Sequence, residues 1–444
     1  MEPRLIRQLT TRNYKNLRGD NSVEESRTKL DKLNIFIGPN SSGKSNLIGV
    51  LRFLGGCVSD LSDATRDRTG FDDAIFRLGG PGILDRAIAS PAVVKFQFEF
   101  DSMVENRVNV LELELLVQDA TKPVIINQES LQGQALQHFA SDEPFFYYQS
   151  HSRRSGEGRV SVYKDGVGGG QKHPPKRSSK LVPLEVVVPV NALTLSSIPE
   201  LLERSTYPPE NTPVYEVRRE LIETIAGWRF YNANHMNLRE IRLAEPKIGP
   251  NDRFLSPDGE NVALVLHNLT RDSLDFEEEI NNAARTILPT TRKVRAVPSG
   301  RLSLTVEWHF ADLNTPFYLS ELSDGTVRML CWATILLAPT LPSLLVIDEP
   351  EVGLHVAWLP ILAEWIKSAS ERTQVIICTH SPDLLDHFTD SVNHAYVFNP
   401  AKADRNHYVI NQLNEALVAD WLAEGWQLGD LYRVGNPSVG GWPW

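Results

Sequence analysis

The sequence predicts an α/β fold, because three short apolar segments have the character of buried strands of one parallel sheet. They cover residues 33–37, 344–347 and 374–378. The first runs into a glycine-rich loop and a helix, the second into two acids and the third into a histidine. Since the carboxyl ends of parallel strands meet at one edge of a sheet, these polar residues are expected to converge.

The glycine-rich loop has the spacing G-x-x-x-x-G-K-S, between a predicted strand and a predicted helix. In such a loop the backbone N–H groups surround phosphate oxygens, Lys44 reaches the β- and γ-phosphates, and the Ser45 hydroxyl coordinates Mg²⁺. A chance glycine-rich turn is the alternative. We expect ATP and Mg²⁺ to bind, with nucleotide contacts from Gly38, Pro39, Asn40, Ser41, Ser42, Gly43, Lys44, Ser45 and Asn46.

The acids and the histidine are the candidates for the remaining chemistry. Asp348 is expected to bind Mg²⁺, directly or through water, and Glu349 to act as the general base toward the attacking water. His380, at the end of the next strand, is suited to sense the γ-phosphate or to hold that water. A lone histidine is more often an ordinary surface or core residue. Its position at a strand end favours the catalytic interpretation, so the catalytic candidates are Lys44, Glu349 and His380.

A small polar turn at residues 322–326 precedes another helix, predicted from the spacing of Val327, Leu330 and Leu337. The N-terminus of a helix has free N–H groups and attracts anions. Ser323, Asp324 and Gly325 are therefore candidate nucleotide contacts. An ordinary serine N-cap is the alternative.

The order of these four motifs resembles that of ABC-type ATPases, with residues 322–326 as the signature and 351–355 in the place of the D-loop. The segments "IGPNSSGKSNLI", "LSDGTVRML", "LLVIDEPEVGLH" and "ICTHSPDLLD" are similar to the RecF-, SMC- and OLD-like group. The motifs at 228–231 and 258–263 are similar to those of stand-alone bacterial predicted AAA ATPases related to OLD proteins. The resemblance covers residues 1–100 and 225–400.

This resemblance implies a two-lobed ABC-type P-loop ATPase head with an inserted arm or lid region. It also implies an ATP-sandwich dimer or a higher assembly, in which Ser323 and Gly325 complete a site held by a second copy. The sequence departs from the family in one respect, since no glutamine has a clear Q-loop setting and Gln97 alternates like a strand residue. OLD proteins carry a TOPRIM nuclease, for which the stretch after residue 400 is too short, so any effector is expected to be a separate chain.

The resemblance, together with the composition, implies four parts of the chain. We expect an N-terminal ATPase lobe at 1–130, an insertion or arm at 131–245, a C-terminal ATPase lobe at 246–400, and a helix with an aromatic tail at 401–444. Within the insertion, residues 151–180 hold eight Lys and Arg against two acids, which suits either a nucleic-acid contact or a solvated loop. The tail's tryptophans and Tyr432 either pack on their own domain or dock a partner.

Bulk properties favour an ordinary globular protein. The net charge of −11 argues against non-specific coating of nucleic acid. Cys57, Cys331 and Cys378 are far apart in apolar surroundings, as in a reducing compartment. The N-terminus lacks the apolar core of a signal peptide, and prolines interrupt the longest apolar run, 329–347. We therefore expect a cytoplasmic protein that does not associate with membranes.

Three functions are compatible with these motifs. The first is a sensor or scaffold ATPase in bacterial anti-phage defence, acting with a separately encoded nuclease or toxin. The second is a RecF-like ATPase of DNA repair and recombination. The third is a nucleotide-dependent scaffold with little turnover. The sequence does not separate the first two, because both use the same ATPase machinery.

Overall fold

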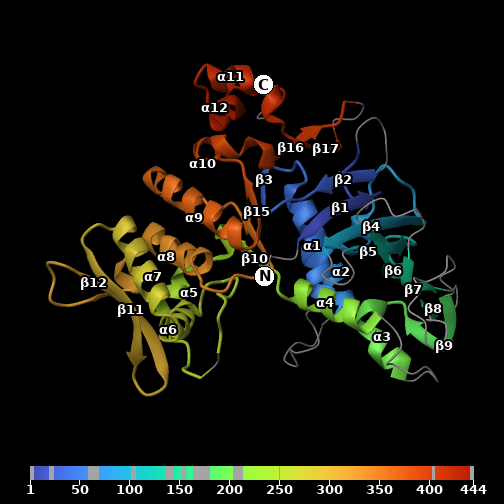
Figure 1. Ribbon diagram of the computed structural model, residues 1–444, viewed down its shortest axis with the longest axis horizontal. Helices are drawn as coiled ribbons and strands as arrows, with labels where there is room; N and C mark the ends of the chain where they lie inside the picture. The colour runs from blue at the N-terminus through green and yellow to red at the C-terminus, as the bar shows by residue number, and fades with distance from the viewer. Residues whose placement is uncertain are drawn as a thin grey trace, which may run out of the picture.

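The computed structural model describes residues 5–19, 25–58, 70–101, 107–135, 145–152, 157–163, 181–203, 214–249, 251–402 and 406–440. These residues form three sheets with helices between and around them (Figure 1). The basic residues expected in segment 151–180 lie outside the described residues, with the exception of Arg159.

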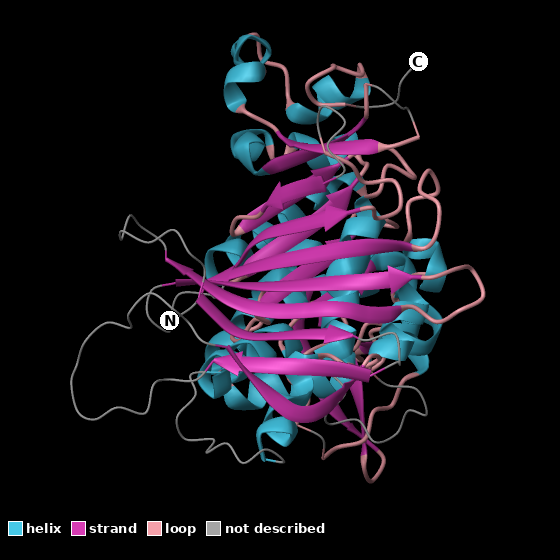
Figure 2. Ribbon diagram, turned by 90° about the vertical axis from the view of Figure 1, so that its right-hand side faces the viewer, coloured by secondary structure: helices cyan, strands magenta, loops and turns pink. Residues whose placement is uncertain are grey.

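An eight-stranded antiparallel sheet forms one side of the molecule, in the order β2-β1-β4-β5-β6-β7-β8-β9. Its strands are β1 (Ile6–Arg12), β2 (Glu25–Lys29), β4 (Ala92–Asp101), β5 (Arg107–Val117), β6 (Ile125–Ala135), β7 (Phe145–Ser152), β8 (Glu157–Tyr163) and β9 (Leu181–Pro189). In β4 apolar residues alternate with polar ones, so Phe96 and Phe98 are buried on the inner face and Gln97 lies on the outer face. Figure 2 shows the outer face toward the viewer, with the helices behind it.

A six-stranded sheet lies at the centre, in the order β10-β14-β15-β3-β16-β17. Its strands are β3 (Leu33–Ile37), β10 (Arg229–Asn232), β14 (Leu344–Asp348), β15 (Gln374–Thr379), β16 (Ala395–Pro400) and β17 (Tyr408–Gln412). All neighbours are parallel except β16 and β17. The inner strands β3, β14 and β15 are mostly apolar because both faces of the sheet are covered there.

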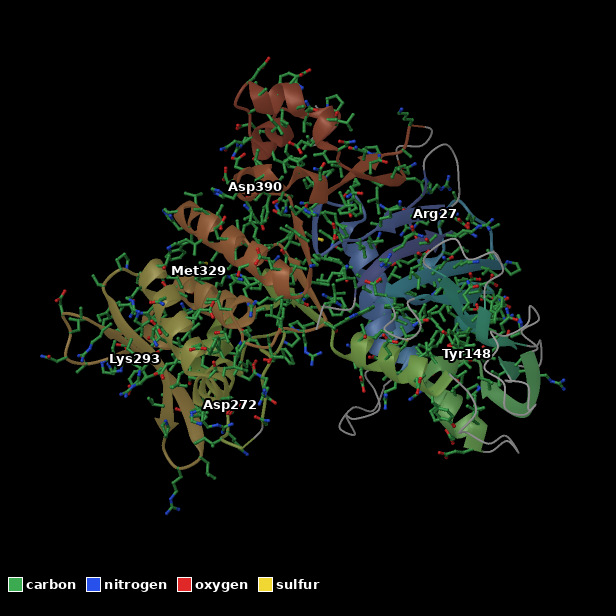
Figure 3. All side chains as sticks on the ribbon, in the orientation of Figure 1. Arg27, Tyr148, Asp272, Lys293, Met329 and Asp390 are labelled. Atoms are coloured by element: carbon green, nitrogen blue, oxygen red, sulfur yellow. The ribbon has the colours of Figure 1, made fainter. Side chains whose placement is uncertain are left out.

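Alternate residues of the central strands belong to two different cores. Ile35 and Ile37 join one core, whereas Phe36 joins the other. Helices of the second core are α1 (Lys44–Val58), α2 (Phe71–Leu78), α3 (Thr194–Glu203) and α4 (Val214–Ala226). Helices of the first are α5 (Leu238–Leu243), α6 (Val262–Asp272), α7 (Leu274–Ile287), α8 (Asp324–Leu336), α9 (Leu359–Arg372), α10 (Pro382–Asp386) and α12 (Leu428–Arg433). Met329 of α8 lies inside this helical lobe (Figure 3).

The smaller elements complete the two lobes. A three-stranded sheet of β11 (Thr291–Ser299), β12 (Ser303–Phe310) and β13 (Phe317–Tyr318) packs on α6 and α7. Short helical turns are η3 (Gly80–Ile83), η5 (Ala233–His235), η6 (Leu319–Glu321), η7 (Val356–Trp358), η8 (Thr389–His394), η9 (Glu415–Leu417) and α11 (Ala419–Ala423). Among the described residues, no helix is long and apolar enough to cross a membrane.

The middle of the chain contributes to the eight-stranded sheet. The expected boundary between residues 130 and 131 falls inside β6, and β7, β8 and β9 extend the same sheet. Buried Glu129 joins this part to α3, because its carboxylate accepts hydrogen bonds from the Tyr148 hydroxyl at 2.6 Å and from the Thr194 and Leu195 backbone N–H groups at 2.6 and 2.7 Å. Figure 3 shows Tyr148 on the inner side of the sheet. The four-part division of the chain stays a prediction.

Candidate active site

The candidate site lies at the carboxyl edge of three adjacent parallel strands. β15 pairs with β14 on one side and with β3 on the other, in register through Asp348 and Cys378 and through Thr379 and Ile37. The loop that follows β3, the acids that follow β14 and the histidine that follows β15 therefore emerge together. The structure brings together Lys44, Asp348 and Glu349, since both carboxylates act electrostatically on the lysine.

The phosphate loop is a tight turn that excludes side chains at its glycines. Gly43 has a φ of +101°, and a Cβ there would lie 2.6 Å from Leu17 Cδ2. At Gly38 a Cβ would lie 2.8 Å from the Ser42 hydroxyl oxygen. The Lys44 ammonium lies over the loop, donating hydrogen bonds to the carbonyls of Gly38 and Pro39. Burial lowers the pKa of Lys44. Such a closed ring of backbone fits phosphate oxygens and leaves the lysine ready to exchange carbonyls for phosphates.

A turn after β1 supports this loop. The Asn16 amide donates to the Ser41 carbonyl at 3.1 Å, and the Asn46 amide donates to Asn16 Oδ1 at 2.8 Å. The Tyr14 hydroxyl donates to the Asn46 carbonyl at 3.1 Å. Asn46, expected as a nucleotide contact, thus uses its side chain to fix the start of α1. The sequence segment "NYKNL" marks this turn, although its spacing does not reveal which atoms it supports.

Asp348 lies between a cation and an amide. The Asn232 amide donates to Asp348 Oδ2 at 2.9 Å, from the neighbouring strand β10. Burial raises the pKa of Asp348, and so does the charge of Glu349; the Asn232 hydrogen bond and the charges of Arg52 and Lys44 oppose this rise. A desolvated carboxylate near a serine hydroxyl is a suitable oxygen-donor set for Mg²⁺. Ser45 lines the same cavity as Asn232, which is the hydrogen-bond partner of Asp348.

Glu349 is held in an unusual conformation by contacts on both sides. Its φ is +52°, a left-handed conformation that is costly for a residue with a Cβ. Its N–H donates to the Cys378 carbonyl at 2.8 Å. One carboxylate oxygen accepts a hydrogen bond from the Asn234 amide at 2.8 Å, and the other lies 3.2 Å from His380 Nδ1. The backbone strain and the two contacts together aim this carboxylate away from its own strand.

Glu351 is a further carboxylate that the sequence did not single out for chemistry. Its Oε1 accepts a 2.6 Å hydrogen bond from Thr379, the residue before His380. Its Oε2 is buried and has no hydrogen-bond partner among the residues that the structure describes. Burial raises the pKa of Glu351. The hydrogen bond between Thr379 and Glu351 fixes the end of β15 to the turn after β14.

The signature turn belongs to the other face of the central sheet. Ser323 caps α8 by accepting a hydrogen bond from the Thr326 N–H at 3.2 Å. Asp324 pairs with Arg242 at 2.5 Å, and a Cβ on Gly325 would lie 2.8 Å from the Trp358 ring. Helix α8 packs in the first core and α1 in the second, on opposite sides of the central strands (Figure 1). The structure of one chain therefore does not bring Ser323, Asp324 and Gly325 to its own phosphate loop.

Two asparagines, Asn232 and Asn234, were missed by the sequence reasoning. Both follow the short strand β10, which pairs in parallel with β14, so this strand also ends at the candidate site. The sequence motif at residues 228–231, which ends just before them, indicates only a similarity to other ATPases. Treating it as a fourth strand of the same parallel sheet would have identified them. Gln97, the glutamine considered for the Q-loop, lies on β4, where its side-chain amide donates a hydrogen bond to the Glu99 carboxylate at 3.1 Å.

The comparison with protein families identifies the chain. Residues 33–86 and 198–386, more than half of the sequence, match the family described as "AAA domain, putative AbiEii toxin, Type IV TA system". The chain belongs to this family. Its fold is that of a two-lobed ABC-type P-loop ATPase head, as expected from the resemblance to RecF- and SMC-like proteins. No curated protein matches the chain.

Three solved structures with 12% sequence identity are similar to this AAA-domain protein. "Crystal structure of the SmcHead bound to the C-winged helix domain of ScpA" has a TM-score of 0.49 and covers 93% of this chain and 99% of that one. "SMC head domain from Thermotoga maritima" has a TM-score of 0.42 and covers 93% of this chain and 100% of that one. The SMC head with an extended coiled coil, bound to the C-terminal domain of ScpA from Pyrococcus furiosus, has a TM-score of 0.44 and covers 95% and 99%.

Proposed function

We propose that this AAA-domain protein binds ATP with Mg²⁺ and hydrolyses it. The observation that carries the proposal is the position of Glu349, aimed out of its strand between Asn234 and His380, at the edge where Lys44 and Asp348 also lie. Lys44 and the loop N–H groups bind the β- and γ-phosphates. Ser45 and Asp348 hold Mg²⁺, which neutralises phosphate charge when bound.

Glu349 acts as the general base in this proposal. Its carboxylate accepts a proton from the water that attacks the γ-phosphate, and His380 orients that water or the phosphate. The contact of 3.2 Å between His380 Nδ1 and Glu349 Oε1 couples the two groups. Asn232 and Asn234 position Asp348 and Glu349 and touch neither phosphate nor water in this scheme.

Two substitutions test binding and hydrolysis separately. Lys44→Ala should abolish ATP binding, because the loop loses its cation, while the fold stays intact. Glu349→Gln should bind ATP with near-normal affinity and reduce kcat by roughly 10²-fold or more, the typical contribution of a general base. Equilibrium binding of a fluorescent ATP analogue and release of phosphate are the two measurements. Wild-type turnover in Glu349→Gln would contradict the general-base assignment.

We also propose that two copies share each site, with Ser323 and Gly325 of one completing the γ-phosphate contacts of the other. This proposal is supported by the distance in the fold between the signature turn and the chain's own loop, on opposite sides of the central sheet. Ser323 caps α8 whether or not a partner is present, so a loss of activity needs a control for the lost cap. Ser323→Thr keeps the capping hydroxyl and Ser323→Ala removes it without adding bulk.

Ser323→Arg should leave ATP affinity near normal and abolish hydrolysis, because the large cation blocks the shared site. Ser323→Thr should stay active, and Ser323→Ala should lose roughly 1 kcal/mol of stability but retain part of its turnover. Mixing Ser323→Arg with Lys44→Ala should restore some hydrolysis, since one site of the mixed dimer then has an intact loop and an intact signature. Normal hydrolysis by Ser323→Arg alone would refute the shared site.

For the biological role we propose anti-phage defence, with a separately encoded effector. The description of the family as a toxin of a type IV toxin–antitoxin system supports this role over DNA repair. Phage should form fewer plaques on host cells that carry the gene and its neighbouring genes than on cells that carry the Glu349→Gln variant. Sensitivity to DNA damage without any change in plaque number would favour the RecF-like alternative.

A further inference from the structure

A cavity of about 580 Å³ lies beside α1, on the side facing α2 and β10. Its walls include Ser45, Gly49 and Arg52 from α1, Arg77 from α2, and Arg229 and Phe230 from β10. We call it the α1–β10 pocket. Its volume is in the range of small-molecule sites, roughly 300–1,000 Å³.

The pocket extends well beyond the space that a bound triphosphate would fill. Its lining residues on α1 run from Ser45 to Gly56 along one side of the helix. At about 1.5 Å per residue this is roughly 16 Å from the phosphate loop. Asp348, Glu349 and His380 do not line it. It therefore adjoins the proposed Mg²⁺ position at one end and is otherwise separate from the proposed active site.

The charges around the pocket are strongly unbalanced. Of the lining residues that the structure describes, four have cationic side chains and one, Asp73, has a carboxylate. Asp73 pairs with Arg77 at 2.7 Å, and the other three cations form no ion pair with a carboxylate among the residues that the structure describes. The cations are Lys15, Arg52, Arg77 and Arg229. His235 also lines the pocket and adds a further cation when protonated.

Arg52 shows the imbalance most clearly. In the part of the chain that the structure describes, it forms no ion pair with a carboxylate. Its guanidinium lies 5.3 Å from the centroid of the Phe230 ring, which is a cation–π contact. Burial lowers the pKa of Arg52, and the charge of Asp348 partly offsets this. Arg229 likewise stacks on Phe254, at 4.8 Å, and its hydrogen bonds within the described part of the chain go to the backbone carbonyls of Ala226 and Trp228. Planar arginines fixed on rings are well suited to bind phosphate.

We propose that the α1–β10 pocket binds a small phosphate-bearing ligand, of about mononucleotide size, at a site separate from the ATP of the phosphate loop. Arg52 and Arg229 contact the phosphate, and Arg77 closes the outer wall. The apolar floor, with Phe53 and Ile225, accommodates the uncharged part of the ligand. The pocket adjoins Asn232, which holds Asp348, so that an occupied pocket lies directly behind the proposed metal site.

The test uses the full-length Lys44→Ala protein, in which the phosphate loop cannot bind nucleotide, so its outcome does not depend on ATP hydrolysis. Titration calorimetry with AMP and with pyrophosphate should show binding with a Kd below about 1 mM. Comparison of the two probes distinguishes a nucleotide ligand from an inorganic one. Adding Arg52→Gln should weaken binding at least about tenfold, as loss of a charge-assisted hydrogen bond does.

Arg301→Gln is the matched control, because Arg301 is an exposed arginine outside the pocket. It should leave the affinity unchanged. Circular dichroism checks each fold, and Arg77→Gln replaces Arg52→Gln if the latter unfolds. The proposal is overturned if neither probe binds Lys44→Ala, if the pocket variants bind as tightly as their parent, or if only an oligonucleotide binds.

Discussion

Removing the Asn234 side chain should slow hydrolysis without weakening ATP binding. Asn234 donates to Glu349 Oε2 at 2.8 Å, while His380 contacts the other carboxylate oxygen. The turn that carries Asn234 is itself fixed. The Asn234 N–H donates to Asn232 Oδ1 at 2.7 Å, and the Arg328 guanidinium donates to the Ala233 carbonyl. In Asn234→Ala the general base keeps one of its two contacts and can rotate away from the water.

The expected decrease in kcat follows from how far the Asn234–Glu349 pair is exposed to solvent. A hydrogen bond to a charged group contributes about 1.5–3 kcal/mol. The Glu349 side chain is 26% exposed and Asn234 is exposed, so solvent screening places the contribution of their hydrogen bond at or below the lower end of this range. A loss of about 1.4 kcal/mol in the transition state corresponds to about tenfold in kcat. We therefore expect kcat to fall between about threefold and tenfold, with KM for ATP unchanged.

The assay is steady-state phosphate release at saturating Mg²⁺, with kcat and KM measured separately. Asn237→Ala is the control, because Asn237 caps α5 in the same segment through the Glu240 N–H. It should change neither constant. Wild-type kcat in Asn234→Ala would refute the positioning role, and so would an increase in KM alone, because that would mean Asn234 contacts the nucleotide.

Three further predictions concern neighbouring groups. Asn232→Ala removes a hydrogen bond that favours the charged form of Asp348, and so raises the pKa of Asp348 further. Because only the ionised carboxylate binds Mg²⁺, the acidic limb of the pH–rate profile should move to higher pH. An unchanged acidic limb would contradict this. Glu351→Gln should stabilise the protein by about 1 kcal/mol near pH 8, since it removes a desolvated charge while still accepting from Thr379. The folded-state pKa of Glu351 lies above its unfolded value, so the gain in stability should shrink as the pH falls through the folded pKa. Thermal melts at several pH values measure this gain. A gain that stays constant with pH would argue against ionisation of Glu351 as the cause. Glu129→Ala leaves the Tyr148 hydroxyl and the first N–H groups of α3 without their acceptor, and should cost about 3 kcal/mol in urea unfolding, whereas a loss under 1 kcal/mol would show that water replaces the carboxylate.

The strands of the site could be predicted from the sequence, because a parallel strand buried on both faces is an uninterrupted apolar run. Residues 33–37 and 374–378 were read in this way, and β3 and β15 cover them. The strand β10 was harder to place, since Arg229 and Asn232 flank only two apolar residues. The contacts of Asn232 and Asn234 depend on the pairing of β10 with β14, which are more than a hundred residues apart, and local patterns contain no information about such pairing.

The role of the signature turn illustrates how one residue can satisfy two interpretations. The sequence raised a serine N-cap and a nucleotide contact as alternatives for Ser323, and the structure shows the cap. Capping uses one acceptor lone pair of the Ser323 hydroxyl toward the Thr326 N–H, and the hydroxyl oxygens of Ser323 and Thr326 lie 2.7 Å apart, so that either can donate to the other. When Thr326 donates in that pair, the Ser323 O–H is free to donate to an anion in front of the helix, at no cost to the cap. The cap therefore orients the residue for an external anion, and the two interpretations are compatible. The same reasoning makes Ser323→Thr the decisive control, because it preserves both the acceptor and the donor.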